Sequence, residues 1–396
     1  MSQLTQRRLL LQSILALPLA GCGGGGGGGE GALASERVLP QVSTQPAGSS
    51  QGAIPAVDDM VQQQLLAQRI PGASLVVARS GRIVYAKGYG YADLEAATPI
   101  QVEQRFEIGS VTKSFAASAI MLLVEDGLLT LDDRLEPYLG ATPAAWNGIT
   151  IRHLLNHSSG LPEYPDDAFF AALERDQGFS TAELLARFKT HGLAFPPGSS
   201  FLYSNTGYDL IGLIIQKVSG QHYGEFLRRR VFQPLGMDSA RLMAPNESAA
   251  GNAIGYEIVA EQRRPHAYNS AERNYLALAA SGLQINALDM AKWDAALYTE
   301  RILKRATLDL MWTPNSLMQA ANATTPDIWY GLGWQLRTQQ GHRWVYHSGG
   351  MPGHVVDFIR YPDDQLTVIV MTNLDERHAN ARVIARTVAQ IIQPGL

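Results

Sequence analysis

Hydrophobic and polar positions follow two different periods along the chain, and the helical period dominates the middle. Apolar residues recur at helical spacing over 57–68 near the start, and then over 110–126, 180–189, 205–218, 224–231 and 287–298. The segment 110–126 is apolar almost all round and contains neither Pro nor Gly. We therefore expect its helix to be buried rather than to lie on the surface.

Short apolar runs of the strand type lie outside this helical middle. Segments 73–78 and 83–86 are separated by Ser80-Gly81, which predicts a β-hairpin. Residues 88–91 faintly resemble a phosphate-binding glycine loop, but no helix with the right spacing follows, so a turn after a strand is the better interpretation. Near the C-terminal end, the pattern predicts strands over 330–336, 343–347, 355–361 and 366–372 and a closing helix over 377–392.

Together these elements predict an α/β fold of the α+β type. The most economical arrangement joins the N-terminal hairpin and the C-terminal strands in one antiparallel sheet, with the terminal helices packed on it. The helical middle then forms a second, mostly helical lobe. We expect an active site between the sheet and this lobe, because ligand sites concentrate in clefts between such units.

The N-terminal segment is predicted to lie outside this fold. Arg7 and Arg8 precede an apolar stretch over 9–20, which is too short to span a bilayer and is typical of a secretory signal. The stretch ends at Leu19-Ala20-Gly21-Cys22, which resembles a bacterial lipobox. We expect residues 1–22 to be a lipoprotein signal peptide with Cys22 lipidated; an ordinary signal peptide with an incidental cysteine is the alternative.

A flexible tether is expected next, over 23–56. It opens with seven consecutive glycines over 23–29 and continues rich in Ala, Ser, Gln and Pro. The prediction is therefore a globular domain over 57–392, exported and lipid-anchored in a bacterial cell envelope, on the periplasmic or the outer surface. Cys22 is the only cysteine, so the chain forms no internal disulfide.

The overall charge argues against nucleic acid as a partner. The 396 residues carry a formal net charge of −4, so no basic field covers the chain. A hydrophobic fraction of 46% is enough for a large core. These numbers leave the oligomeric state open.

A hydroxyl and an amine stand three residues apart at the start of the helix predicted over 110–126. Positions i and i+3 lie on one face of a helix, so Ser110 and Lys113 are within reach of each other. Ser110 would also lie at the positive end of the helix dipole, which favours negative charge there. A hydroxyl beside an amine, held out of water, is a candidate nucleophile. The alternative is a helix cap followed by a solvated lysine.

Tyr203-Ser204-Asn205 supplies a second set of candidates where the helix over 205–218 begins. A phenol and an amide two residues apart at such a junction can point into one cleft. Since model Tyr and Lys both titrate near about 10, Tyr203 and Lys113 would each need the other's charge to act near neutral pH. A core tyrosine with a capping asparagine is the alternative.

A third candidate stretch, His347-Ser348-Gly349-Gly350, ends a predicted strand. Glycines at such a place let a substrate approach the backbone closely. The alternative is a simple strand-to-loop turn.

Other catalytic or metal-binding signatures are weak. His153 and His157 have the i, i+4 spacing of zinc proteases, but Leu154 replaces the required glutamate and no further ligand set stands out. The G-x-S-x-G motif of α/β-hydrolases is absent. Segment 158–162, a rival serine site by composition, is predicted to be a turn. We therefore expect neither a metal nor a cofactor.

In their order along the chain, the three motifs resemble those of the penicillin-recognising serine hydrolases. A Tyr-x-Asn second motif marks the class C β-lactamase-like branch, which also holds D-alanyl-D-alanine carboxypeptidases, D-aminopeptidases and family VIII carboxylesterases. The resemblance extends to the stretches 154–162, 234–237, 281–283 and 330–334, and it covers roughly residues 57 to 392.

The resemblance implies a β-lactamase/transpeptidase-like fold and a role for each motif residue. Ser110 would be the acylated nucleophile, and Lys113 and Tyr203 would pass its proton to the leaving group. Asn205 would orient Lys113 and the acyl side chain. The backbone N–H groups of Ser110 and Gly350 would form the oxyanion hole, and the substrate-binding set would be Asn205, His347, Ser348, Gly349 and Gly350.

His347 departs from the lysine of true class C β-lactamases and is similar to the carboxypeptidase and peptidase branch. Because histidine titrates near about 6.5, it offers a substrate carboxylate a less constant positive charge, which argues against efficient β-lactamase activity.

The sequence thus predicts a serine hydrolase that works through an acyl-enzyme on a D-Ala-type peptide or a related small amide or ester. Its partners would be that small-molecule or peptide substrate and, through the lipid anchor alone, a membrane. A carboxylesterase or a weak β-lactamase is an alternative. A non-catalytic module that binds cell-wall peptides is the alternative of another class, and the intact set Ser110, Lys113 and Tyr203 argues against it.

Overall fold

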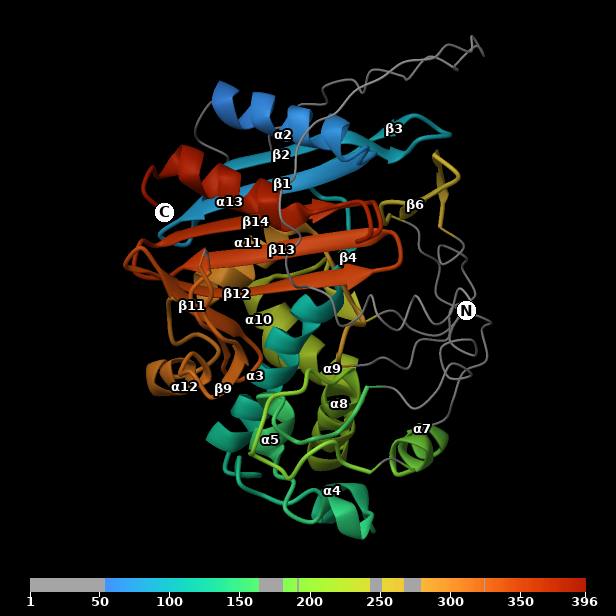
Figure 1. The fold of residues 1–396 in the computed structure, drawn as a ribbon, viewed down its shortest axis with the longest axis vertical. Coiled ribbons are helices and arrows are strands. Elements are labelled where there is room, and N and C mark those ends of the chain that lie inside the picture. The colour runs from blue at the N-terminus through green and yellow to red at the C-terminus, as the bar shows by residue number, and fades with distance from the viewer. Residues whose placement is uncertain (1–53, 164–180, 191, 243–250, 267–278, 324) are drawn as a thin grey trace.

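The computed structural model describes residues 54–163, 181–190, 192–242, 251–266, 279–323 and 325–396 (Figure 1). The predicted signal peptide, the lipidation of Cys22 and nearly all of the predicted linker lie outside the described residues. None of the helices in these ranges is long and apolar enough to cross a membrane.

The predicted helical middle contains short strands that the sequence pattern did not predict, β5 (Arg241–Leu242) to β8 (Leu283–Ile285), and another, β4 (Phe106–Glu107), precedes it. The helices are α2 (Pro55–Ala67), α3 (Thr112–Glu125), α4 (Glu136–Leu139), α5 (Ile151–Leu155), α7 (Thr181–Phe188), α8 (Asn205–Ser219), α9 (Tyr223–Leu227), α10 (Gln233–Leu235), α11 (Ala287–Ala296), α12 (Arg305–Met311) and α13 (Ala381–Ile392), with short helical turns η1 (Gly109–Val111), η2 (Ala144–Trp146) and η3 (Arg228–Phe232). The strands are β1 (Gly72–Arg79), β2 (Arg82–Asp93), β3 (Thr98–Pro99), β4 (Phe106–Glu107), β5 (Arg241–Leu242), β6 (Tyr256–Val259), β7 (Gln262–Pro265), β8 (Leu283–Ile285), β9 (Ser316–Gln319), β10 (Ile328–Tyr330), β11 (Gln335–Gln339), β12 (His342–Met351), β13 (His354–Tyr361) and β14 (Leu366–Thr372).

A nine-stranded sheet joins the two ends of the described chain, in the order β3-β2-β1-β14-β13-β12-β11-β10-β9. All of its strand pairs are antiparallel, and β1 meets β14 in a register that places Val76 opposite Ile369. The predicted sheet built from both chain ends is therefore confirmed.

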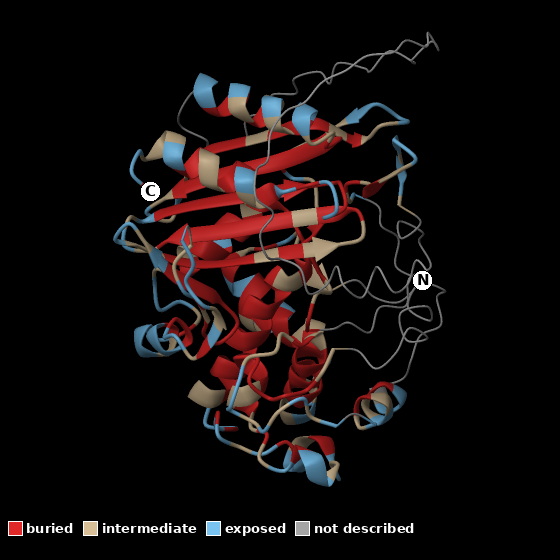
Figure 2. Cartoon of the chain, viewed as in Figure 1, coloured by how far each residue is buried: buried red, intermediate tan, exposed pale blue. Residues whose placement is uncertain are grey.

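Alternation along the central strands divides the core into two layers. In β14, Val368 and Val370 pack with α2 and α13, whereas Ile369 and Met371 point to the opposite face and join the core of the helical lobe. Figure 1 shows α2 and α13 side by side on one face of the sheet, and Figure 2 shows how completely the strands between the layers are buried. The site lies on the other face, where the sheet meets α3.

Helix α3 is the buried axis of the helical lobe. Every residue from Thr112 to Leu123 is buried, as its all-round apolar pattern predicts. Helix α8 packs beside it, and the Ser204 hydroxyl caps α8 by accepting a hydrogen bond from the backbone N–H of Gly207 at 3.1 Å. Both helices therefore begin at the same end of the lobe, with the motif residues at their first turns.

Two predicted elements differ in kind from the structure, and two differ in extent: the closing helix begins at Ala381, and the strand expected over 343–347 runs to Met351. Residues 88–91 belong to strand β2 instead of a turn, because pairing with β1 continues through Gly72 and Gly90. The single strand expected over 330–336 is two strands, β10 and β11, separated by a turn. There Gly333 has φ +83°, and a Cβ on it would lie 2.5 Å from the Cβ of Ala117 and 2.9 Å from the carbonyl oxygen of Lys113. The turn thus packs tightly against the first turns of α3.

Candidate active site

Ser110 lies in the short helical turn η1, directly before α3. The turn is held by strand β8: the Ile108 N–H donates to the carbonyl of Leu283 at 3.0 Å, and the Leu283 N–H donates to the Thr112 hydroxyl at 3.3 Å. Ser110 itself is only partly buried, while Val111 and Thr112, which follow it, are fully buried. The hydroxyl is therefore presented at a surface by a rigid support.

The Lys113 amine is the centre of the site. Its Nζ lies 3.0 Å from Ser110 Oγ, 2.6 Å from Asn205 Oδ1 and 2.8 Å from the carbonyl oxygen of Ala280. As an ammonium the group donates to all three acceptors. When it loses a proton, its lone pair becomes available to the hydroxyl of Ser110.

Burial makes that deprotonation accessible near neutral pH. The side chain of Lys113 is fully buried, and desolvation lowers its pKa to about 7, although the charges of Glu163 and Asp209 act in the opposite direction. An amine with this pKa, in contact with a hydroxyl, is a competent general base at neutral pH. The contact between Ser110 and Lys113 thus has the geometry that a nucleophile and its general base require.

Tyr203 lies over the amine. Lys113 Nζ is 4.8 Å from the centroid of the Tyr203 ring. Burial raises the pKa of Tyr203, and the Ser110 hydroxyl, as a hydrogen-bond partner, opposes that shift. The phenol is therefore protonated at neutral pH, so of the two groups Lys113 is the one that accepts the first proton. Tyr203 can donate its phenol proton to a leaving group and then accept a proton from Lys113.

Asn205 links the lysine to a carboxylate that the motifs did not predict. Its backbone N–H donates to Glu163 Oε2 at 2.9 Å, and its Nδ2 donates to Glu163 Oε1 at 2.7 Å. This leaves Oδ1 of Asn205 directed at Lys113. A signal for Glu163 existed, because it follows directly on the stretch 154–162 that carries part of the family resemblance.

His347 approaches the site through an aromatic cluster. Its Nε2 lies 2.8 Å from the hydroxyl of Tyr330, and its Nδ1 lies 2.7 Å from the carbonyl of Ser348. Burial and, to a smaller extent, the charge of nearby Lys113 together lower the pKa of His347 to about 3. The imidazole is therefore neutral at physiological pH and supplies no fixed positive charge.

Gly349 and Gly350, which follow His347, let strand β12 pack closely against the turn η1 that carries Ser110. A Cβ on Gly349 would lie 1.9 Å from the carbonyl oxygen of Ile108 and 3.0 Å from the backbone N of Ser110. Gly109 has φ +51°, and a Cβ on it would lie 2.8 Å from the backbone N of Gly350. The backbones of Gly350 and Ser110 therefore lie next to each other.

Ser348 differs from its neighbours in this strand. Because side chains alternate along a strand, it faces the opposite side from His347, and its Oγ accepts a hydrogen bond from Arg382 Nη2 of α13 at 2.6 Å. Of the predicted site residues, Ser110, Lys113, Tyr203 and Asn205 form one connected cluster. His347, Gly349 and Gly350 line its edge, and Ser348 contacts α13.

The two histidines with zinc-protease spacing have structural partners. His153 Nδ1 accepts a hydrogen bond from the backbone N–H of Thr150 and so completes the cap of α5. His157 is buried against the rings of Tyr203 and Tyr330, at centroid distances of 4.2 and 4.5 Å. No group of three or more His, Cys, Asp or Glu that could hold a metal ion occurs among the described residues.

Comparison with known proteins agrees with this geometry. The Beta-lactamase family matches residues 57–393. Penicillin-binding protein 4* of Bacillus subtilis is 32% identical over 332 residues, which are 81% of this chain and 72% of that protein. The octameric penicillin-binding protein homologue from Pyrococcus abyssi superimposes with a TM-score of 0.74 at 30% identity, covering 86% of this chain and 77% of that one. The D-amino acid amidase from Ochrobactrum anthropi SV3 gives a TM-score of 0.72 at 25% identity, covering 86% and 99%.

The chain therefore belongs to the β-lactamase family, and it is a serine hydrolase of the β-lactamase/transpeptidase fold. The expected resemblance and fold class are confirmed.

Proposed function

We propose that this chain hydrolyses D-Ala-type peptides or related small amides and esters through an acyl-enzyme on Ser110. The observation that carries this proposal is the fully buried Lys113 amine, with a pKa of about 7, placed 3.0 Å from the hydroxyl of Ser110. A binding module would gain nothing from a desolvated lysine, because burying an ionisable group costs stability. The enzyme reading explains that cost.

In the first half-reaction, Ser110 Oγ attacks the substrate carbonyl carbon while neutral Lys113 accepts the hydroxyl proton. The backbone N–H groups of Ser110 and Gly350 stabilise the negative charge on the carbonyl oxygen. Tyr203 donates its proton to the departing nitrogen or oxygen and is reprotonated from Lys113. In the second half, water attacks the acyl-enzyme, and the same groups move the proton in reverse.

The charges at the site argue against an efficient β-lactamase. A β-lactam carries a carboxylate near its scissile bond, and neutral His347 gives that carboxylate no counter-ion. Similarity to a D-amino acid amidase and to penicillin-binding proteins supports small amides and peptides as the substrate class. A carboxylesterase remains the second candidate, because the same acyl-enzyme chemistry cleaves esters.

The test is a substrate panel on a soluble form that begins at residue 54. It comprises a D-Ala-D-Ala peptide, a short-chain aryl ester and a chromogenic cephalosporin, each run against Ser110→Ala. Turnover of the peptide that depends on Ser110 supports the proposal, and turnover of the ester alone favours the carboxylesterase. Efficient cephalosporin hydrolysis would refute the electrostatic argument.

We further propose that Cys22 anchors the enzyme by lipid to a bacterial cell-envelope membrane. The support is the Leu19-Ala20-Gly21-Cys22 stretch and the glycine run that follows it. A tether of this kind would hold the hydrolase near the membrane surface without a spanning helix.

A further inference from the structure

One carboxylate beside the candidate oxyanion hole has no part in the mechanism above. A Cβ on Gly350 would lie 2.2 Å from Glu376 Oε2, so the Glu376 carboxylate rests directly against the backbone of Gly350. Its charge also reaches into the site, where it contributes to the raised pKa of Tyr203. The Glu376 residue is largely exposed, although desolvation of its carboxyl and the charge of Asp375 raise its pKa. Within the part of the chain that the structure describes it makes no hydrogen bond or ion pair.

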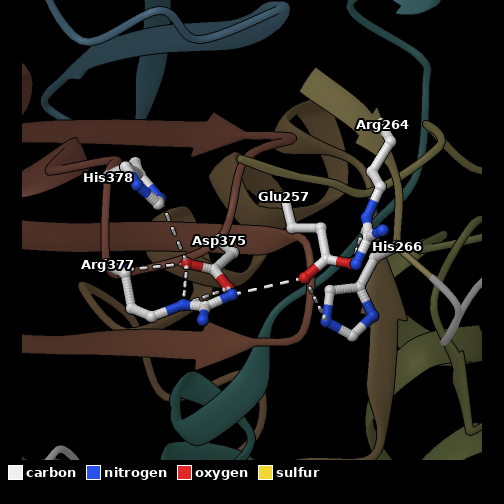
Figure 3. Close-up of polar contacts among 6 residues, drawn as sticks. All are labelled: Glu257, Arg264, His266, Asp375, Arg377 and His378. Carbon is white, nitrogen blue, oxygen red and sulfur yellow. Dashed lines mark hydrogen bonds and ion pairs between the residues drawn. The ribbon is translucent and has the colours of Figure 1, made fainter. Parts of the chain in front are cut away.

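The segment that carries Glu376 is held in place by its two neighbours. The Arg377 guanidinium donates to Asp375 Oδ2 at 2.6 Å and lies 3.4 Å from Glu257 Oε2 of strand β6 (Figure 3). Arg264 and His266 also converge on Glu257, at 3.1 and 3.9 Å.

A backbone hydrogen bond also holds this segment in place: the Asp375 N–H donates to the carbonyl of Tyr256 at 3.0 Å. With Asp375 and Arg377 engaged, Glu376 is the side chain left free to face Gly350. The position of its charge is therefore built into the fold.

Within the described ranges, the cations around the site are weakened by burial or already paired. Lys113 has a pKa of about 7 and His347 is neutral. Arg377 is engaged by two carboxylates, and Arg382 is held by the Ser348 hydroxyl and lies 3.6 Å from Asp357 Oδ1. Among the residues that the structure places, the Glu376 carboxylate is thus a negative charge without a paired cation at the place where the substrate carbonyl would bind.

We propose that Glu376 selects substrates with a positively charged nitrogen next to the scissile carbonyl, such as amino-acid esters and amides with a free α-ammonium group. This inference rests on the proposed function. When the carbonyl oxygen occupies the site at Gly350, an α-ammonium group is about 3 Å from that oxygen by bond geometry alone. The Glu376 carboxylate is then within reach of it. A substrate carboxylate at the same place is repelled.

Three benzyl esters that differ only in charge test the proposal: those of D-alanine, N-acetyl-D-alanine and N-succinyl-D-alanine, with benzyl alcohol release as the measurement. At pH 7 and low salt we expect kcat/KM to fall by about tenfold from the cationic to the neutral ester, and again to the anionic one. The preference should weaken as ionic strength rises, because the charge is exposed.

Two variants and a matched control complete the experiment. Glu376→Gln should remove the preference for the cationic ester and leave the neutral ester within about threefold of wild type, and Glu376→Lys should reverse the order. Glu136→Gln removes another exposed carboxylate, on helix α4, which Figure 1 shows at the end of the helical lobe away from the sheet, and should change nothing.

Two results would overturn the inference in different ways. Equal rates for all three esters, unchanged in Glu376→Gln but abolished in Ser110→Ala, would reject the role of Glu376 while leaving the proposed function intact. Hydrolysis that survives Ser110→Ala, or no hydrolysis of any ester, would reject the proposed function and this inference with it.

Discussion

The Glu163 carboxylate holds Asn205 with both of its oxygens, one on the backbone N–H and one on the side-chain amide. These two hydrogen bonds determine which end of the amide faces Lys113. Because Nδ2 donates to Glu163, Oδ1 faces Lys113 and accepts a hydrogen bond from its Nζ at 2.6 Å. Glu163 also acts through space, because its charge raises the pKa of Lys113 against the effect of burial. It is a positioning residue and an electrostatic one.

We expect Glu163→Gln to move the acid limb of the pH–rate profile to lower pH. Removal of the negative charge lets desolvation lower the pKa of Lys113 further, so the lysine loses its proton earlier as pH rises. A fall in kcat should accompany the shift, because a glutamine cannot accept both hydrogen bonds. The pH dependence of kcat/KM for wild type, Glu163→Gln and the control Glu136→Gln decides the matter. A fall in kcat with an unmoved limb would mean that Glu163 only supports structure.

The wild-type profile should have a single acid limb with an apparent pKa near 7. Below that pH Lys113 is an ammonium with no lone pair, so kcat/KM should fall by about tenfold per pH unit. His347 should add no limb of its own near 6.5, because burial holds its pKa at about 3. A profile that is flat from pH 5 to pH 8 would exclude Lys113 as the base.

Tyr203→Phe should lower kcat by about 10² to 10⁴ with little change in substrate binding, because the ring remains and only the proton-transferring group is lost. Lys113→Ala should cost at least as much. The double variant should lose far less than the product of the two, since groups that act as one unit are not additive. A kcat within about threefold of wild type in Tyr203→Phe, well short of the loss expected for an acid–base group, would remove Tyr203 from the proton path.

Ser110 should be the residue that a fluorophosphonate or penicillin probe labels. The reason is geometric: its hydroxyl is presented at a partly exposed turn and lies 3.0 Å from the Lys113 amine, the proposed base. Mass spectrometry of the labelled peptide locates the adduct. In Ser110→Ala the label should disappear, and its persistence on Ser158 would transfer the nucleophile to that rival site.

Cys22→Ala should stop lipid incorporation in a bacterial host. Wild-type protein should take up labelled fatty acid and fractionate with membranes, whereas the variant should not. Both should hydrolyse substrate equally, because residue 22 lies far before the start of the hydrolase domain at residue 57. Absence of label in the wild type would contradict the lipobox interpretation.

Much of the site was predictable because its first pair is local. Ser110 and Lys113 are three residues apart at the start of one helix, and helix geometry alone brings such residues together. The same holds for the fold class: strand-type runs at both ends and helical runs between them leave few arrangements that bury every apolar face. The turn at Gly333 that separates β10 from β11 could not be predicted in this way. It depends on the close packing of Gly333 against α3, which the local sequence does not show.

The sequence by itself therefore determined the closeness of Ser110 and Lys113, the candidate nucleophile and base, and the order of the motifs, all of which depend on spacing along the chain. Only the tertiary structure decided how these groups titrate. Lys113 has a pKa near neutral pH because the surrounding lobe excludes water from it, and His347 is neutral for the same reason. Only the tertiary structure, too, placed Glu163 and Glu376, since neither has a fixed sequence distance from the residues it touches. Their charges act through space, across contacts that exist only when sheet and helices are packed together.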